Sequence, residues 1–486
     1  MVFSSVIFLE YFLPLTLMIY YGIRILPIRN ANQKRRACNV VLLVASLFFY
    51  ACGGASYLLL LGAVLLINYC GGLLIARKAG AEKLILWIVI ILDFGLLFCF
   101  KYLNLFVVIC ENCIGTGMEA GERLNHILTL TRTGQLAYTD IVLPIGISFY
   151  IFQAVSYVAD VYRREAKVQR NFFDFALYIS FFPQLIAGPI VQYTDIEKQL
   201  TGRSESVDMF ADGVGRFIYG LSKKVLIANT LAEVADGIMN LEATGLGASV
   251  TWLGAICYSL QIYYDFSGYS DMAIGLGKMF GFTFRENFNK PYNALSIRDF
   301  WRRWHISLSS WFKQYVYIPL GGSRVSEGKV CRNLFLVFLF TGIWHGANFT
   351  FLFWGLMYGA LLIVERLFLG KILERNRRKL LNRVYTLFFV VMGWVLFRAD
   401  NILQAGAYMR EMFSRGNGEY TVFSFLSVRS MLALVIGAVF SFPVFTRLRE
   451  KLKGSVWAIV FQTVLLVLAM LAVMNGSYNP FLYFQF

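Results

Sequence analysis

Charged residues are scarce in this chain. Only 15% of its 486 residues are Asp, Glu, Lys or Arg, whereas 58% are apolar and 17% are aromatic. Soluble domains carry about 25% charged residues because they need a hydrated shell. The composition therefore excludes an ordinary soluble protein and predicts one whose surface lies largely in a lipid bilayer.

The motifs of several enzyme classes are also absent. The chain has no phosphate loop, no G-x-S-x-G nucleophile elbow and no H-E-x-x-H zinc helix. Its three histidines and eight scattered cysteines form no ligand cluster, and Cys110 and Cys113 are an isolated C-x-x-C pair. We therefore expect no metal site and no bound cofactor.

The net charge of +16 reflects 45 basic and 29 acidic residues. The bases stand mainly in short segments between apolar runs, as in the cytoplasmic loops of membrane proteins, rather than in a nucleic-acid-binding patch. We therefore expect contacts with membrane lipids, no nucleic-acid partner, and a multi-pass location in the cell (cytoplasmic) membrane.

Apolar runs recur along the whole chain. A spanning helix needs about 20 mostly apolar residues. The pattern predicts an all-α polytopic membrane protein with about 11–12 transmembrane helices, forming one domain over residues 1–486. The segments are 3–24, 38–52, 56–76, 84–109, 141–160, 214–236, 248–280, 333–346, 349–368, 384–399, 427–446 and 455–474.

The connecting segments predict the orientation. The acidic segment 111–140 is expected outside, together with both termini. Basic loops mark the cytoplasmic side, and they occur at 24–36, 77–83, 163–170, 371–383 and 447–453.

Two stretches depart from simple spans. Residues 171–192 are apolar but interrupted by Pro183, Gly188 and Pro189. Irregular backbone is tolerated at membrane depth only beside protein or a water-filled cavity, so we expect a re-entrant segment that lines an internal cavity. Residues 285–332 are basic and aromatic, which predicts short interfacial helices on the cytoplasmic side.

His345 is a candidate catalytic residue because it stands between two apolar runs. An ionisable side chain at membrane depth costs at least a few kcal/mol and usually faces a cavity. Gly342 and Gly346 leave room for a substrate beside it, and Asn348 could orient it or stabilise an oxyanion. The alternative is a core histidine bound to a carbonyl.

A second group of polar and aromatic residues surrounds His305. By itself, this segment also fits an interfacial helix that binds lipid headgroups, but its arginines could equally bind the phosphates of a cofactor or lipid carrier. Asp265 and Asp271 interrupt another apolar region, so we expect both to face a cavity. The candidate substrate or tunnel residues are Trp344, Asn348, Arg302, Arg303, Trp304, Asp265 and Asp271.

Several long motifs follow one another in a fixed order. Together they resemble the membrane-bound O-acyltransferase (MBOAT) family over essentially the whole chain. Within that family, the chain is most similar to the bacterial branch that includes the membrane subunit of alginate O-acetylation. The motifs are 143–150 (LPIGISFY), 156–157 (SY), 160–163 (DVYR), 182–190 (FPQLIAGPI), 265–272 (DFSGYSDM), 299–308 (DFWRRWHISL), 317–322 (YIPLGG) and 344–347 (WHGA).

The resemblance implies a funnel-shaped membrane core with a tunnel. It implies that His345 is the essential histidine and that His305 is the second characteristic polar position. The acyl donor would be a cytoplasmic thioester, acetyl-CoA or an acyl carrier protein, used as a co-substrate. The acceptor would be a hydroxyl of an extracellular polysaccharide, reached directly or through an extracytoplasmic SGNH or esterase-like acetyltransferase.

The last six residues, 481–486 (FLYFQF), have two interpretations. They fit an aromatic anchor at the membrane interface, or a carrier segment in which Tyr483 takes up the acyl group and passes it on. Other functions also stay open. D-alanyl transfer to teichoic acid is the nearest, and a non-enzymatic transporter or a lipid-binding scaffold would suit the same buried polar groups.

Overall fold

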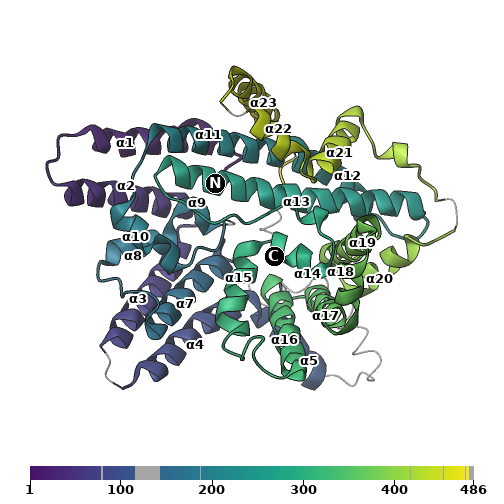
Figure 1. The fold of residues 1–486 in the computed structure, drawn as a ribbon, viewed down its shortest axis with the longest axis horizontal. Coiled ribbons are helices and arrows are strands. Elements are labelled where there is room, and N and C mark those ends of the chain that lie inside the picture. Colours follow the sequence, from purple (N-terminus) through teal and green to yellow (C-terminus); the bar gives the residue numbers. More distant parts are fainter. Residues whose placement is uncertain are drawn as a thin grey trace.

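The computed structural model describes residues 1–77, 80–114, 143–186, 188–415, 418–452, 454–476 and 478–480. Every regular element in these ranges is a helix, which confirms the predicted all-α class (Figure 1). The N-terminal elements are η1 (Ile7–Phe12), α1 (Leu13–Ile25), α2 (Ala31–Ala51), α3 (Tyr57–Ala76), α4 (Glu82–Lys101), α5 (Leu103–Ile114) and α7 (Ile147–Arg163).

The rest of the chain contains both short and long helices. The middle elements are α8 (Phe172–Ser180), α9 (Phe182–Leu185), α10 (Tyr193–Gly202), α11 (Val207–Ser222), η3 (Lys223–Ala228), α12 (Asn229–Met239), α13 (Ala248–Met279), η4 (Pro291–Asn293), α14 (Ile297–Arg303), α15 (Ile306–Phe312) and η5 (Lys313–Tyr317). The C-terminal elements are α16 (Glu327–His345), α17 (Phe349–Val364), η6 (Glu365–Leu369), α18 (Gly370–Arg375), α19 (Lys379–Arg398), α20 (Ile402–Glu411), η7 (Val422–Ser424), α21 (Val428–Phe440), α22 (Val444–Leu452) and α23 (Val456–Met474).

The number of long apolar helices is lower than the 11–12 expected. Among the described residues, six helices are long and apolar enough to cross a membrane, or seven if α21 and α22, bent by 81°, form one span. The other apolar segments do not form a helix that is both long and apolar enough, because polar residues interrupt them or because they fold as short pieces. The architecture is nevertheless that of a polytopic membrane protein.

Helices α11 and α13 lie side by side along the long axis of the molecule (Figure 1). Glycines allow this contact. A Cβ atom at Gly275 of α13 would lie 2.7 Å from the carbonyl oxygen of Gly213 of α11, and one at Gly268 would lie 2.8 Å from that of Gly220. Small residues let two membrane helices approach closely and gain dispersion energy. Two other groups of helices lie below this pair in the view of Figure 1, α3, α4 and α7 at the left and α16, α17 and α19 towards the right.

The broken segment 171–192 has the irregular structure predicted for it. It contains α8, α9 and an extended stretch, and its described residues from Asp174 onward are buried. Protein groups satisfy its backbone: Phe182 N donates to Ser46 Oγ at 3.0 Å, and Ile190 N donates to Ser307 Oγ at 3.0 Å. These bonds explain how non-helical backbone is accommodated in an apolar interior.

Glu205, in the loop between α10 and α11, ties that loop to the first two helices. It accepts hydrogen bonds from Tyr20 Oη at 2.5 Å and from Arg35, and it forms an ion pair with Arg24 at 2.8 Å. Burial raises the pKa of this carboxyl, but the hydrogen bonds from Arg35 and Tyr20 outweigh that effect and hold the pKa below its ordinary 4.5. Glu205 is therefore a buried anion held by several donors.

Candidate active site

His345 is the last residue of α16, and its ring is enclosed by aromatic side chains. The rings of Trp354 and Phe397 each lie 5.0 Å from the imidazole, centroid to centroid, and meet it nearly edge-on. Trp344 lies 4.9 Å away. These contacts fix the imidazole plane and leave one part of the half-buried residue facing a cavity.

The cavity beside His345, called here the His345 cavity, has a volume of about 230 Å³. The α2–α3 turn, the end of α4, the start of α7 and Phe266 of α13 form its walls, and the broken segment contributes Ile186. The prediction that this segment lines an internal cavity is therefore confirmed. Besides His345, Lys101 is the only basic side chain among the described residues that line this cavity.

Lys101, the last residue of α4, touches the backbone next to His345. Its Nζ donates to the carbonyl oxygen of Trp344 at 2.6 Å and lies 3.5 Å from Ser148 Oγ. The next residue, Tyr102, donates from its hydroxyl to the carbonyl oxygen of Ile343 at 2.7 Å. The last carbonyls of a helix lack intrahelical partners, so Lys101 and Tyr102 cap α16 where it presents His345.

His305 also packs near Trp344. Its ring centroid is 6.4 Å from that of Trp344, and the residue is only 4% exposed. Its backbone is left-handed, with φ of 45°, between α14 and α15. Asn287 holds this turn, because its carbonyl accepts from Ile306 N at 2.9 Å and its side chain accepts from Ser307 Oγ at 2.9 Å. The fold thus brings both predicted histidines to one tryptophan.

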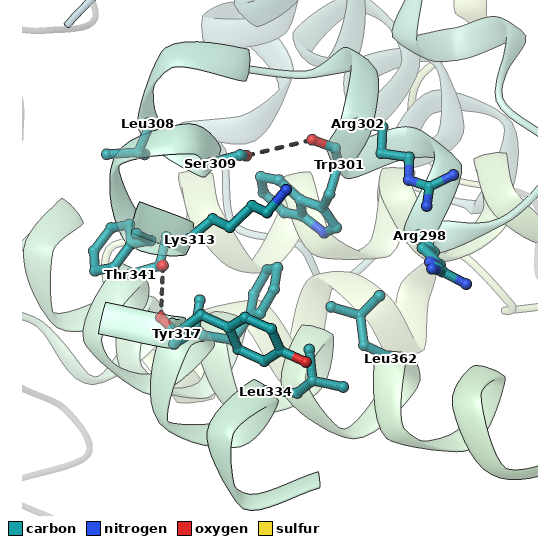
Figure 2. Close-up of a pocket in the computed structure, with 13 residues that line it drawn as sticks. Arg298, Trp301, Arg302, Leu308, Ser309, Lys313, Tyr317, Leu334, Thr341 and Leu362 are labelled. Carbon is teal, nitrogen blue, oxygen red and sulfur yellow. Dashed lines mark hydrogen bonds between the residues drawn. The ribbon is translucent and has the colours of Figure 1, made fainter. Parts of the chain in front are cut away.

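A second cavity, called here the basic cavity, has a volume of about 220 Å³. Figure 2 shows Arg298 and Arg302 of α14 at one side and Lys313 reaching in from another. Its inner wall includes Trp301 and Thr341, and Thr341 is about one helical turn before His345 on α16. The cavity is therefore basic at its rim and apolar inside.

Aromatic side chains separate the two cavities. The ring of Trp301 lies 5.5 Å from that of Trp354, which in turn contacts His345 at 5.0 Å. His345 and Trp344 thus lie close to both spaces, although they line only the His345 cavity among the described residues.

The predicted arginines have different environments. Arg302 is exposed and lines the basic cavity, whereas Arg303 Nε binds Asp299 Oδ1 at 2.8 Å. Trp304 packs in the aromatic core, 4.7 Å from the ring of Trp394. Only Arg302 of these three therefore faces the basic cavity.

The two predicted aspartates are paired with bases on neighbouring helices. Asp265 Oδ1 lies 2.6 Å from Lys224 Nζ, and both side chains are almost completely buried. Asp271 binds Arg216 at 2.8 Å and Lys223 at 2.6 Å. Asp265 directly precedes Phe266, which lines the His345 cavity. Both acids hold α13 to α11 and η3.

Three residues near His345 have structural contacts that the pattern did not indicate. Asn348 caps α17 by accepting from Thr350 N at 2.9 Å and donates to Asp400 O at 3.0 Å. A Cβ atom at Gly342 would strike the carbonyl oxygen of Phe351, and one at Gly346 would strike the Phe351 ring. These glycines permit packing of α16 on α17, so the expectation that they leave room for a substrate was wrong.

The described end of the chain is hydrogen-bonded to two buried side chains, Lys224 and Asn229, and to Asp236. Lys224 Nζ donates to Pro480 O at 2.5 Å, and Asn229 Nδ2 donates to Asn479 Oδ1 at 3.2 Å. Tyr478 Oη donates to Asp236 Oδ2 at 2.9 Å. Tyr483 lies outside the described residues.

No group of three or more His, Cys, Asp or Glu side chains that could hold a metal ion occurs in the part of the chain that the structure describes.

The site residue that the sequence motifs did not indicate is Lys101. A lysine at the end of an apolar run was a usable signal, because intramembrane cations usually have a partner or a function. Its partner, a backbone carbonyl, could not be read from side-chain patterns.

Several known proteins are similar to this chain in sequence. The chain matches the membrane-bound O-acyltransferase (MBOAT) family over residues 84–404. It is 40% identical to a probable alginate O-acetylase AlgI from Pseudomonas putida, over 100% of both chains. It is 36% identical to a peptidoglycan O-acetyltransferase from Helicobacter pylori, over 85% of this chain and 80% of that one. It is 30% identical to a teichoic acid D-alanyltransferase from Bacillus subtilis, over 52% of this chain and 68% of that one.

Proposed function

Because the chain belongs to the membrane-bound O-acyltransferase family and is a multi-pass membrane acyltransferase, we propose that it transfers an acetyl group to a hydroxyl of an extracellular polysaccharide, directly or through a partner. Relatives named as O-acetylases of alginate and peptidoglycan support this substrate class. The observation that carries the proposal is the position of His345, which lines one cavity and lies one helical turn after Thr341, a residue that lines a second cavity with a basic rim.

The basic cavity is the proposed donor site. Arg298, Arg302 and Lys313 form a cationic rim suited to the phosphates of acetyl-CoA or of a carrier protein's prosthetic arm. The apolar walls, which include Trp301 and Phe338, suit the thioester arm. The predicted cytoplasmic position of residues 285–332 agrees with a cytoplasmic donor.

His345 is the proposed general base. It takes the proton from the acceptor hydroxyl as the hydroxyl oxygen forms a bond to the thioester carbonyl carbon. The Lys101 ammonium, in the same cavity, stabilises the negative charge on the carbonyl oxygen. The carbon–sulfur bond then breaks, and the thiolate receives the proton held by the imidazolium. His305 packs against Trp344, the residue directly before His345, and so supports the position of the base.

The acyl group has more than one route to the final acceptor. A tyrosine relay would place the acetyl group first on the Tyr483 hydroxyl and then on a sugar or an extracytoplasmic SGNH-like partner. The anchoring of residues 478–480 at Lys224 and Asn229 favours a tail held close to the core. Loss of the surface ester in Tyr483→Phe, with normal protein abundance, would support the relay.

The decisive experiment measures ester-linked acetate on surface polysaccharide from a deletion strain. The strain is complemented with wild type or with His345→Gln at matched protein abundance in the membrane. We expect wild type alone to restore the ester. Equal restoration by both would remove His345 from the chemistry. If the ester did not depend on the gene at all, the same samples would be assayed for ester-linked D-alanine, the transfer named for the Bacillus subtilis relative.

A further inference from the structure

A large pocket far from His345 in the fold lies between the start of α2 and the segment that leads into α8. Its volume is about 1000 Å³. It is called here the Arg36 pocket. Arg36, Asn39 and Val40 of α2 line one wall, and Arg170 and Phe173 line another. It shares no lining residue with the His345 cavity or the basic cavity.

The pocket has an excess of positive charge after its internal pairs are taken into account. Arg35 is bound to Glu205. Asp174, the acid that lines the pocket, has both oxygens occupied by amides: Asn39 Nδ2 donates at 2.8 Å and Asn171 Nδ2 donates at 2.9 Å. Arg36 and Arg170 are exposed and are in no ion pair among the described residues. Two guanidinium groups are therefore available to an anion.

The floor of the pocket is held rigidly around these two arginines. Tyr69 Oη donates to the carbonyl oxygen of Arg170 at 2.6 Å, and Gln169 Oε1 accepts from Asn171 N at 2.9 Å. The backbone that carries Arg170 is thus fixed while its side chain stays exposed. Such an arrangement lowers the conformational cost of binding.

The rim next to Arg36 is apolar and exposed. Val40, Val44 and Phe48 follow Arg36 at intervals of four residues, so all four share one face of α2. The side chains of Val40, Val44 and Phe48 are 47%, 61% and 60% exposed, and that of Phe173, across the pocket, is 61% exposed. A polar site with two cations is therefore continuous with an apolar stripe along the helix.

We propose that the Arg36 pocket binds the phosphodiester headgroup of an anionic phospholipid, whose acyl chain lies along the apolar stripe of α2. Arg36 and Arg170 bind the phosphate oxygens. The exposed stripe favours a lipid over free phosphate, because only a lipid covers Val40, Val44 and Phe48. The basic segments 24–36 and 163–170 place the pocket at the cytoplasmic leaflet, where anionic lipids and juxtamembrane bases attract each other.

The test uses the full chain in nanodiscs and does not depend on acyl transfer. Wild type, the double variant Arg36→Gln/Arg170→Gln and the control Arg375→Gln/Arg377→Gln are reconstituted with mixtures of phosphatidylglycerol and phosphatidylcholine. The control removes the same charge from exposed residues at the α18–α19 connection. Native mass spectrometry counts the phosphatidylglycerol molecules that each protein retains as the fraction of this lipid falls.

We expect wild type and the control to retain phosphatidylglycerol selectively and the Arg36/Arg170 variant to need at least about tenfold more of it for equal retention. Circular dichroism checks that all three are equally helical. Equal retention by the pocket variant and wild type would overturn the proposal, as would equal loss in the control. Displacement of the lipid by inorganic phosphate at the same concentration would assign the pocket to a soluble anion instead.

Discussion

Replacement of Lys101 by methionine separates the two roles that the ammonium has in the structure. Methionine has a similar length and is apolar, so it fills the same space without a charge or a donor. The substitution removes the hydrogen bond to Trp344 O and the only lysine or arginine side chain among the described residues lining the His345 cavity.

The expected change in stability is small. A hydrogen bond to a charged group contributes about 1.5–3 kcal/mol, and a cation at a helix C-terminus adds about 0.3–1 kcal/mol. Methionine also removes the desolvation penalty of the ammonium, which is several kcal/mol for a buried ion. These effects oppose each other, so we expect the free energy of unfolding to change by about 1 kcal/mol in either direction.

The expected loss of activity is much larger. If the Lys101 ammonium stabilises the developing oxyanion, its removal lowers the turnover rate by about 100-fold. Ester-linked acetate per mass of surface polysaccharide, at matched membrane abundance, measures this loss. Lys101→Arg keeps the charge and the donors and is expected to recover part of the activity.

Tyr102→Phe is the matched control. It removes the neighbouring hydrogen bond to Ile343 O, worth about 1 kcal/mol, and leaves the charge in the cavity unchanged. We expect its ester content to stay close to that of wild type. Wild-type ester content in Lys101→Met would refute the role of the charge. An equal loss in Tyr102→Phe would show that capping of α16, rather than the ammonium, controls activity.

Three further predictions test other parts of the structure. Arg302→Gln combined with Lys313→Gln should raise the KM for acetyl-CoA in isolated membranes by at least about tenfold, because each lost charged contact is worth about 1.5–3 kcal/mol; an unchanged KM would exclude the basic cavity as the donor site. Glu205→Gln should destabilise the protein by about 3 kcal/mol at neutral pH, because it leaves buried cations without their carboxylate. Its thermal unfolding midpoint should approach that of wild type only as the pH falls below 4.5 and through the lower pKa of the native carboxyl, because wild type then loses the same charge; a constant difference would contradict this assignment. Gly275→Val should destabilise the α11–α13 contact by about 1–3 kcal/mol, whereas Gly62→Ala, where a Cβ atom meets nothing within 4 Å, should leave the unfolding midpoint unchanged or higher.

Much of the architecture follows from the sequence because bilayer chemistry acts on local composition. The long apolar runs at 56–76 and 455–474 became helices α3 and α23, since a backbone in hydrocarbon must satisfy its own hydrogen bonds. Pro183 and the glycine and proline that follow correctly indicated a broken segment. Among the described residues, fewer helices than the 11–12 predicted spans are long and apolar enough by themselves to cross a membrane, because polar residues interrupt some of the apolar segments and others fold as short pieces.

The sequence by itself also singled out His345 and His305, since ionisable residues in apolar surroundings are few and costly. Only the tertiary structure placed both at Trp344, brought Lys101 to the carbonyl of that residue, and showed that Gly342 serves the packing of α17. The physical reason is that these contacts join residues far apart in the chain. Local patterns report which side chains must avoid lipid, but the packing of whole helices decides which groups they meet.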